Sequence, residues 1–360
     1  MRLPKSNKII AMKYSVGLSQ FKSKMAKVKL SANESARGPS PKAMREYLKL
    51  SKNLKRYPDS DGVNLRKALA KKFSLDENKI ILGSGSDQIL ELICKAFIKK
   101  GDEVVVPKYS FLIYRLYSQM NGAKVLYSRE KNFTISVNDI LKKITKKTKI
   151  VFLANPNNPT STYIEKKKLI FLRKKLRSNI LLVVDDAYFE YVKQKDYSSG
   201  LQLFSNFKNV IVTRTFSKIY GLAGLRVGWG YGSKEIINSL NQFKPPFNIN
   251  SPALSAAEAA VQDNAWLSKE IKHVKKWNDK FYKEFKKMNI ETNKSFTNFL
   301  LINFDKVKKN SSKIFRLLAD AGILVRKMNI YGIKNSLRVT IGRNDENKKL
   351  ILKLRKVINV

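Results

Sequence analysis

The chain has 360 residues, of which 72 are Lys or Arg and 28 are Asp or Glu, so its formal net charge is +44. Hydrophobic residues make up 43% of the chain and aromatic residues 10%, which supplies a large buried core and excludes an intrinsically disordered chain. A single cysteine, Cys94, excludes an intramolecular disulfide framework. A single histidine, His273, excludes histidine-rich metal sites. The length predicts about two domains. No apolar run approaches the roughly 20 residues that span a bilayer, so we expect a soluble, cytoplasmic protein.

Most of the positive charge comes from lysine, with 56 Lys against 16 Arg. The lysines are spread along the whole chain in short groups such as Lys166-Lys167-Lys168 and Lys275-Lys276. Proteins that read nucleic acids favour arginine for bidentate contacts. We therefore interpret the charge as a solvated lysine surface, and a basic nucleic-acid-binding protein is the alternative from another functional class.

The N-terminal segment resembles a targeting peptide only weakly. Residues 1–33 contain no acidic residue, but Arg2 is their only arginine and they lack the apolar h-region of a secretory signal. We therefore expect a retained N-terminal arm.

From about residue 79 the sequence alternates short apolar runs with amphipathic segments. The run Ile80-Ile81-Leu82 leads into Gly83-Ser84-Gly85-Ser86, and apolar residues then recur at helical spacing over 87–100 until Gly101. The later runs are β-branched and mostly apolar on both faces, which is typical of parallel strands buried between helices. These runs are Glu103–Val106, Lys124–Tyr127, Ile150–Ala154, Ile180–Asp185, Val210–Thr213 and Leu225–Gly230.

After about residue 250 the pattern changes to a long helical region, 253–288, followed by alternating strands and helices. The strand candidates are Phe299–Asn303, Ile323–Val325 and Leu337–Ile341, and the helix candidates are 310–321 and 345–357. We predict an α/β protein whose large domain, 41–250, has a mainly parallel sheet sandwiched by helices. A smaller α+β domain would combine the N-terminal arm, 1–40, with residues 251–360.

Two loops lie where such a fold binds ligands. Gly83-Ser84-Gly85-Ser86-Asp87 joins a strand to a helix, and backbone N–H groups at a helix N-terminus bind phosphate well. Asn155-Pro156-Asn157-Asn158-Pro159-Thr160 follows a buried strand, at the carboxyl end where open α/β sheets bind ligands. Each loop taken alone is also explained as a plain turn.

Two further segments place charged groups among apolar neighbours. Asp185 and Asp186 end an apolar strand, where a carboxylate is costly to bury unless a positive group meets it. Tyr188 follows three residues later and could reach the same ligand, although surface loop acids would explain the pattern too.

Lys218 lies in the hydroxyl-rich and glycine-rich stretch 213–228. A partly desolvated lysine can lose its proton and form a Schiff base.

In this order the four features resemble the fold-type I, pyridoxal-phosphate-dependent aminotransferases. Further segments resemble the histidinol-phosphate aminotransferase branch of that superfamily, and the resemblance covers about residues 14 to 345. These segments are Tyr14-Ser15-Val16-Gly17, Lys29-Leu30-Ser31-Ala32-Asn33-Glu34-Ser35, Gly38-Pro39-Ser40-Pro41, Arg56-Tyr57-Pro58-Asp59 and Leu337-Arg338-Val339-Thr340-Ile341-Gly342.

The resemblance implies bound pyridoxal 5′-phosphate and a role for each matching residue. Lys218 would bind the cofactor covalently and act as general base and acid, and Asp185 would pair with the pyridinium nitrogen. Tyr188 and Asn158 would bond the ring oxygen O3′, and Tyr109 would stack on the ring. The phosphate would meet Ser86, Asp87, Thr215, Ser217, Arg226 and, from the other subunit of a homodimer, Tyr57.

The branch also implies the substrates, with an amino group moving between L-histidinol phosphate and 2-oxoglutarate in L-histidine biosynthesis. Arg338 would bind the anionic group of both amino donors through its planar fork. Arg326, helped by Tyr14 of the N-terminal arm, is a second candidate for the phosphate, and Asn33 would line the same pocket. Such an enzyme takes small-molecule substrates and implies no metal, no specific nucleic acid and no membrane partner.

Two departures from the family pattern touch no proposed catalytic atom. Ser161 stands where the family usually has glycine, and Asp186 replaces a common glutamate. An aromatic amino-acid aminotransferase and a threonine-phosphate decarboxylase carry the same motifs and stay open as alternatives. His273 and Cys94 lie away from the motifs, and we expect structural roles for both.

Overall fold

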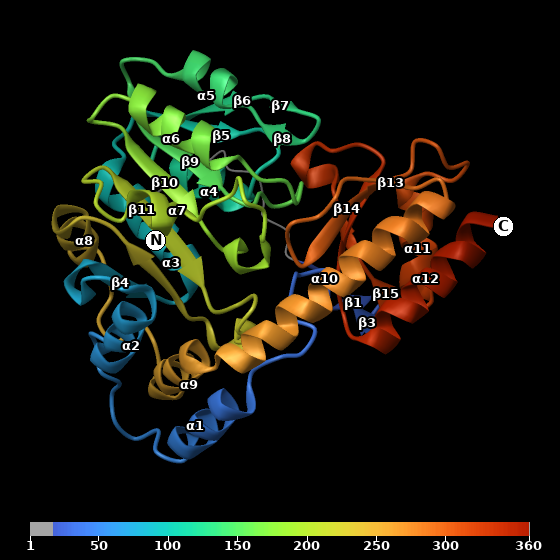
Figure 1. Ribbon diagram of the computed structural model, residues 1–360, viewed down its shortest axis with the longest axis horizontal. Helices are drawn as coiled ribbons and strands as arrows, with labels where there is room; N and C mark the ends of the chain where they lie inside the picture. The colour runs from blue at the N-terminus through green and yellow to red at the C-terminus, as the bar shows by residue number, and fades with distance from the viewer. Residues whose placement is uncertain (1–16, 360) are drawn as a thin grey trace, which may run out of the picture.

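The computed structural model describes residues 17–359, which form a large α/β domain and a smaller α+β domain (Figure 1). The large domain is built on a seven-stranded sheet with the strand order β4-β12-β11-β10-β9-β5-β6. Six of these strands run in one direction, and β12 is antiparallel to both of its neighbours. The predicted α/β class with a mainly parallel sheet is therefore confirmed. The strands are β4 (Ile80–Gly83), β5 (Glu103–Pro107), β6 (Lys124–Ser128), β9 (Thr148–Ala154), β10 (Leu181–Asp185), β11 (Val210–Thr215) and β12 (Gly228–Tyr231).

Helices cover both faces of this sheet, because successive side chains of a buried strand point to opposite sides. Val104 and Phe152 face the side covered by α3 (Gly85–Phe97), α4 (Leu112–Met120) and α8 (Lys234–Asn241). Val105 and Leu153 face the other side. That second side is covered by α2 (Val63–Phe73), α5 (Val137–Lys143), α6 (Lys166–Lys175), α7 (Gly200–Phe204) and α9 (Ser251–Gln262), with α1 (Pro41–Ser51) packed against α9.

The small domain has a four-stranded antiparallel sheet in the order β13-β14-β17-β16. Its strands are β13 (Glu291–Thr292), β14 (Phe299–Asn303), β16 (Arg326–Lys327) and β17 (Ser336–Thr340), and its helices are α10 (Asn264–Lys287), α11 (Ser311–Asp320) and α12 (Asn344–Asn359). The N-terminal part of the described chain joins this domain, because β3 (Val28–Lys29) pairs in parallel with β15 (Ile323–Leu324). Two short hairpins, β1 (Gln20–Phe21) with β2 (Lys24–Met25) and β7 (Glu130–Lys131) with β8 (Thr134–Ile135), complete the sheets.

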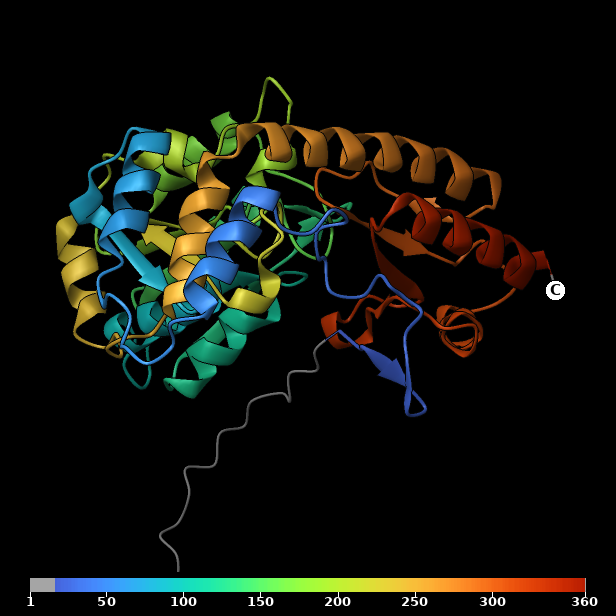
Figure 2. The ribbon, with the colours of Figure 1, turned by 90° about the horizontal axis from the view of Figure 1, so that it is seen from below.

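The helical region predicted over 253–288 is two helices, α9 and α10. Asp263 separates them, and its carboxylate accepts a hydrogen bond from the Trp266 backbone N–H at 3.2 Å, which caps α10. The alanines of α9 pack in the core of the large domain, as does Leu267 at the start of α10, whereas Val274 and Trp277 pack in the core of the small domain. The chain thus passes between the two cores within α10, after the boundary at residue 251 that the sequence predicts (Figure 2).

The carboxyl ends of β9, β10 and β11 meet on the side of the sheet that faces the small domain (Figure 1). The residues that follow these strands are the ones that the sequence singles out, Asn155 to Thr160, Asp185 to Tyr188, and Ser217 with Lys218. Within residues 17–359, no helix combines the length and apolar character that crossing a membrane requires.

Candidate active site

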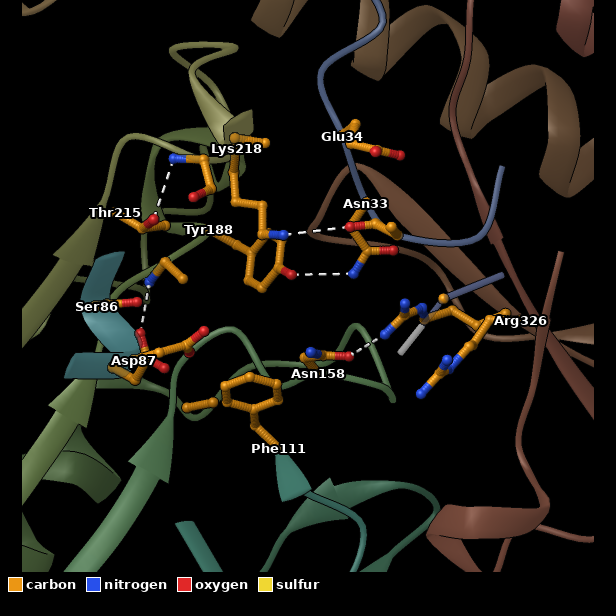
Figure 3. A pocket seen from close by; sticks show the side chains of 18 of the residues that line it. Asn33, Glu34, Ser86, Asp87, Phe111, Asn158, Tyr188, Thr215, Lys218 and Arg326 are labelled. Carbon is orange, nitrogen blue, oxygen red and sulfur yellow. Dashed lines mark hydrogen bonds between the residues drawn. The ribbon is translucent and has the colours of Figure 1, made fainter. Parts of the chain in front are cut away.

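A cavity of about 260 Å³ lies between the carboxyl ends of the large-domain strands and the small domain. Figure 3 shows that its walls come from the loops after β10 and β11, the first turn of α3, the segment around Asn33 and the small-domain arginines. Twelve of the fifteen residues predicted for the site line this cavity. They are Asn33, Ser86, Asp87, Asn158, Asp185, Tyr188, Thr215, Ser217, Lys218, Arg226, Arg326 and Arg338.

Lys218 opens onto the cavity three residues after β11 ends. Its Nζ donates a hydrogen bond to the Ala32 carbonyl oxygen at 3.3 Å. Loss of solvation lowers the pKa of Lys218 to about 8, and the positive charge of Arg338 acts in the same direction. A lysine in this state has a neutral amine available at pH values where an exposed lysine is charged.

Asp185 is the last residue of β10, and hydrogen bonds hold both of its carboxylate oxygens. The Tyr114 hydroxyl donates to Oδ2 at 2.7 Å, and the Ala187 backbone N–H donates to Oδ1 at 3.2 Å. Burial raises the pKa of Asp185 to about 6, and the hydrogen bond from Tyr114 opposes that rise. A buried carboxylate of this kind gains most from a cationic partner placed within the cavity.

Tyr188 and Asn158 are already held by neighbours that connect the two domains. Asn33 donates from Nδ2 to the Tyr188 hydroxyl oxygen at 3.0 Å, and Arg338 donates from Nη1 to Asn158 Oδ1 at 2.5 Å. Arg338 also donates from Nη2 to the Ser31 carbonyl oxygen at 3.1 Å. Small-domain and large-domain groups are thus joined directly in the wall of the cavity.

The opposite end of the cavity is a cradle of donors around the first turn of α3. Arg226, at φ 52°, donates from Nη1 to Ser217 Oγ at 3.3 Å, and its Nη2 lies 3.4 Å from Asp87 Oδ2. A Cβ on Gly85 would lie 2.4 Å from Nη2 of Arg226, so only glycine allows this approach. The N-terminus of α3 together with a guanidinium and the hydroxyl of Ser217 is suited to a phosphate group.

Two arginines form the small-domain wall. Arg326 on β16 and Arg338 on β17 are direct register partners of an antiparallel pair, so their side chains lie on the same face of the sheet. They are only 6% and 5% exposed, and both line the cavity. Within the described part of the chain, Nε of Arg338 is buried without a hydrogen-bond partner. Two adjacent, largely buried guanidinium groups favour an anion of charge greater than one.

Comparison with known proteins identifies the family. The family model described as aminotransferase class I and II matches residues 26–354. The chain belongs to this family. It is 49% identical over 360 residues, all of both chains, to the histidinol-phosphate aminotransferase of Pelagibacter ubique (strain HTCC1062). It is 41% identical to the enzyme of that name from Rhodopseudomonas palustris (strain BisA53), over 91% of this chain and 90% of the other. The chain therefore also belongs to the histidinol-phosphate aminotransferase family, and the resemblance inferred from the motifs is confirmed.

Solved structures share the same fold. The histidinol-phosphate aminotransferase of Sinorhizobium meliloti, determined in complex with pyridoxal-5′-phosphate, superposes with a TM-score of 0.87 at 24% identity, over 93% of this chain and 92% of the other. The enzyme of that name from Clostridium acetobutylicum gives a TM-score of 0.84 at 25% identity, over 92% of this chain and 98% of the other.

Two of the described residues predicted for the site, Tyr109 and Tyr57, do not line the cavity. Tyr109 lies against the small-domain cluster of Leu301, Met328 and Ile333, and Phe111 stands in the cavity wall in its place (Figure 3). Tyr57 is 82% exposed, with its ring stacked on Phe247 at a centroid distance of 4.6 Å. Tyr14 lies outside the described residues.

The sequence motifs also leave some cavity residues unassigned. Phe111 and Tyr114 follow the carboxyl end of β5, so the strand-end rule that selected the other loops would have included them. Glu34 and Tyr331 line the cavity from outside the predicted set. Ser161, which replaces the usual glycine, has φ 59° and keeps the left-handed backbone that glycine favours.

Proposed function

We propose that this chain transfers an amino group from L-histidinol phosphate to 2-oxoglutarate, giving imidazole acetol phosphate and L-glutamate, in L-histidine biosynthesis. The observation that carries this proposal is a lysine of lowered pKa, Lys218, between two separate anion-binding walls. The cradle around Arg226 suits a cofactor phosphate, and the pair of Arg326 and Arg338 suits a phosphorylated substrate. The family to which the chain belongs supports the same reaction.

The residues present fit pyridoxal 5′-phosphate at the first of these walls. A Cβ on Gly228 would lie 2.2 Å from the Ser86 backbone nitrogen. Only glycine at position 228 therefore lets β12 approach the start of α3 this closely. This leaves the donors of Ser86, Ser217, Thr215 and Arg226 around one space. Asp185 lies deeper, where its carboxylate would hold a protonated ring nitrogen.

When bound, pyridoxal phosphate supplies a covalent carrier for the amino group and an electron-accepting ring. Lys218 Nζ, with its pKa lowered to about 8, accepts the proton that leaves the α-carbon of the substrate. The hydrogen bond from Tyr114 opposes the burial that raises the Asp185 pKa to about 6, and the carboxylate would stabilise positive charge beside it. Tyr188 and Asn158 would orient the cofactor ring, and Phe111, which lines the cavity, would contact the ring in the role that the sequence assigned to Tyr109.

The arginine pair binds and orients the substrate. Arg338 presents a planar fork that meets the phosphate of histidinol phosphate in one half-reaction and a carboxylate of glutamate in the other. Arg326 adds a second positive charge, which favours the doubly charged phosphate over a carboxylate. Asn33, fixed by Tyr188 and Thr340, holds the wall next to Arg338.

We further propose that the active unit is a homodimer with a shared site, located in the cytoplasm. Exposed apolar side chains gather around Tyr57, including Leu54 at 70% exposure and Phe247 at 44%. A partner subunit would cover this surface and would receive the Tyr57 hydroxyl at its phosphate cradle. A single cysteine, Cys94, which is buried and free, agrees with a reducing compartment.

The reaction is tested by measuring glutamate formation from 2-oxoglutarate with histidinol phosphate or phenylalanine as amino donor. We expect kcat/KM to be larger for histidinol phosphate, because only this donor carries the dianion that Arg326 and Arg338 are placed to bind. Equal or larger values with phenylalanine would replace the proposal by an aromatic amino-acid aminotransferase.

A further inference from the structure

The proposed function leaves one part of its substrate without a partner. The phosphate of histidinol phosphate would meet the arginine pair and its amino group would meet the cofactor, but the imidazole ring also carries hydrogen-bonding nitrogens. Among the described residues that line the cavity, three are acidic. Asp185 is held by Tyr114, and Asp87 lies against Arg226 in the phosphate cradle. Glu34 is the acidic residue that neither the cofactor nor the phosphate uses.

The backbone at Glu34 is fixed from both sides. Asn298 Nδ2 donates to the carbonyl oxygens of Asn33 at 3.0 Å and of Glu34 at 3.3 Å. The Asn33 backbone N–H donates to Thr340 Oγ1 at 3.0 Å, and Asn33 has φ 58°. Because this backbone is anchored to the small-domain sheet, the Glu34 side chain is presented to the cavity from a rigid support.

The Glu34 side chain interacts with two lysines, Lys29 and Lys218. Lys29 Nζ lies 2.5 Å from Glu34 Oε1, so this ion pair uses one of the two carboxylate oxygens. The charge of Glu34 acts on Lys218, where it opposes the lowering of the Lys218 pKa. Figure 3 shows Glu34 directly beside Asn33, on the wall that Lys218 faces. Tyr331 also lines the cavity without a role in the proposed reaction, but it lies in an apolar cluster with Met328 and Ile333.

We propose that the Glu34 carboxylate accepts a hydrogen bond from a ring N–H of the substrate imidazole and thereby selects imidazole-bearing amino donors over phenyl-bearing ones. This proposal rests on the proposed function. Neutral imidazole has one N–H donor and the protonated ring has two, so either form meets a carboxylate in a charge-assisted hydrogen bond. A phenyl ring in the same place offers no donor and strips water from Glu34 without compensation.

The test compares Glu34→Gln and Glu34→Leu with the intact enzyme, using histidinol phosphate, phenylalanine and glutamate as amino donors. Gln keeps the size and one acceptor oxygen, whereas Leu removes both oxygens. We expect kcat/KM for histidinol phosphate to fall about 10-fold in the first variant and about 100-fold in the second, mostly through KM. Loss of the Glu34 charge acts on Lys218 with every donor, so we expect the selective effect as a fall, by these factors, in the ratio of kcat/KM for histidinol phosphate to that for glutamate or phenylalanine.

Glu91→Gln is the matched control. Glu91 also pairs with a lysine, Lys95, at 2.7 Å, and its side chain is 33% exposed against 39% for Glu34, but it lies on the outer face of α3. This variant should leave the kinetic constants for all three donors at the wild-type values. Melting temperatures of all variants then show whether the fold is intact.

Three results would overturn the inference. An unchanged ratio of kcat/KM between histidinol phosphate and phenylalanine in both Glu34 variants would remove Glu34 from imidazole recognition and leave the proposed function standing. An equal loss with all three donors would show a structural role instead. A wild-type enzyme without activity on histidinol phosphate would remove the proposed function, and the role of Glu34 with it.

Discussion

The hydroxyl of Tyr114 donates a 2.7 Å hydrogen bond to Oδ2 of Asp185, and both groups are buried. The Tyr114 ring is stacked on Phe152, at 5.1 Å between centroids and 5° between planes, so its hydroxyl has little freedom to move away. This contact joins α4 to the end of β10 beneath the cavity. It makes Tyr114 a positioning residue for the carboxylate that would hold the cofactor ring.

Replacing Tyr114 with Phe should therefore weaken cofactor binding. The change leaves a buried carboxylate oxygen without its donor, which costs about 1–3 kcal/mol of folding stability. The change also frees the carboxylate from the position in which it would meet the ring nitrogen, so we expect the dissociation constant of the cofactor to rise about 10-fold. It also removes a hydrogen bond that lowers the Asp185 pKa, which already lies at about 6. Asp185 would then take up its proton at higher pH, so the loss of affinity should begin at higher pH than in the wild type.

Equilibrium titration of the cofactor-free protein with pyridoxal phosphate across pH 5 to 8 measures this effect. Tyr163→Phe is the matched control, because the Tyr163 hydroxyl also donates at 2.7 Å to an aspartate, Asp196, and neither residue lines the cavity. Equal affinities of the Tyr114→Phe protein and the wild type at every pH would remove Tyr114 from the site.

A methyl group at Gly85 should damage the phosphate cradle. The new Cβ would lie 2.4 Å from Arg226 Nη2, and Gly85 has φ +77°. The end of the Arg226 side chain can move aside at little cost, but it then leaves the phosphate cradle, and alanine at this left-handed φ costs about 1 kcal/mol more than glycine. Gly85→Ala should therefore bind the cofactor about 10-fold more weakly, because a charge-assisted hydrogen bond to the phosphate is lost. Gly224→Ala, two residues before Arg226, is the control, because a Cβ there meets nothing within 4 Å. Similar cofactor dissociation constants for the two variants would contradict the cradle.

The lowered pKa of Lys218 predicts unusual reactivity of its amine. In the cofactor-free protein, acylation of Lys218 should reach half of its maximal rate near pH 8, because its pKa lies at about 8 instead of the ordinary 10.5. Exposed lysines should react with a midpoint more than one pH unit higher. Mass spectrometry of labelled peptides across a pH series separates the two populations. A Lys218 midpoint equal to that of the exposed lysines would show that the amine is not desolvated.

Substitutions of Arg326 and Arg338 should have different effects on KM for the two amino donors, glutamate and histidinol phosphate. Arg338→Lys should raise KM for both glutamate and histidinol phosphate, because the bidentate fork is lost for either anion. Arg326→Lys should raise KM mainly for histidinol phosphate. Arg343→Lys, at an exposed arginine 3.3 Å from Asp345, serves as the control. An effect of Arg338→Lys on only one of the two substrates would contradict a shared anion site.

Residues that stand at the ends of buried strands were predictable from the sequence. Apolar, β-branched runs indicate strands, and they lead to Asn158, Asp185 and Lys218. Parallel strands bring their carboxyl ends together, which places these three residues around one cavity. The order of the motifs then indicated the family and the cofactor. Local pattern and chain order were sufficient for these residues.

Other features depend on tertiary contacts that no local pattern encodes. The choice between Tyr109 and Phe111 is decided where α4 begins, because the turn after β5 directs Tyr109 toward Met328 and Phe111 toward the cavity. The sequence of 253–288 does not show where one domain ends and the next begins, because its apolar residues keep the same helical spacing throughout. The first of them pack in the core of the large domain and the later ones in the core of the small domain. The placement of Glu34 depends on Asn298, which binds its carbonyl oxygen, and on Thr340, which accepts from the backbone N–H of the preceding Asn33.

The proposed reaction moves an amino group from histidinol phosphate to the cofactor in this cavity. The most direct test is a half-reaction titration, in which histidinol phosphate, phenylalanine or threonine phosphate is added to the cofactor-loaded enzyme without an amino acceptor. The loss of cofactor absorbance then reports the transfer for each compound. We predict that histidinol phosphate discharges the absorbance at the lowest concentration and the highest rate. An enzyme that responds to phenylalanine or threonine phosphate as readily as to histidinol phosphate would contradict the account.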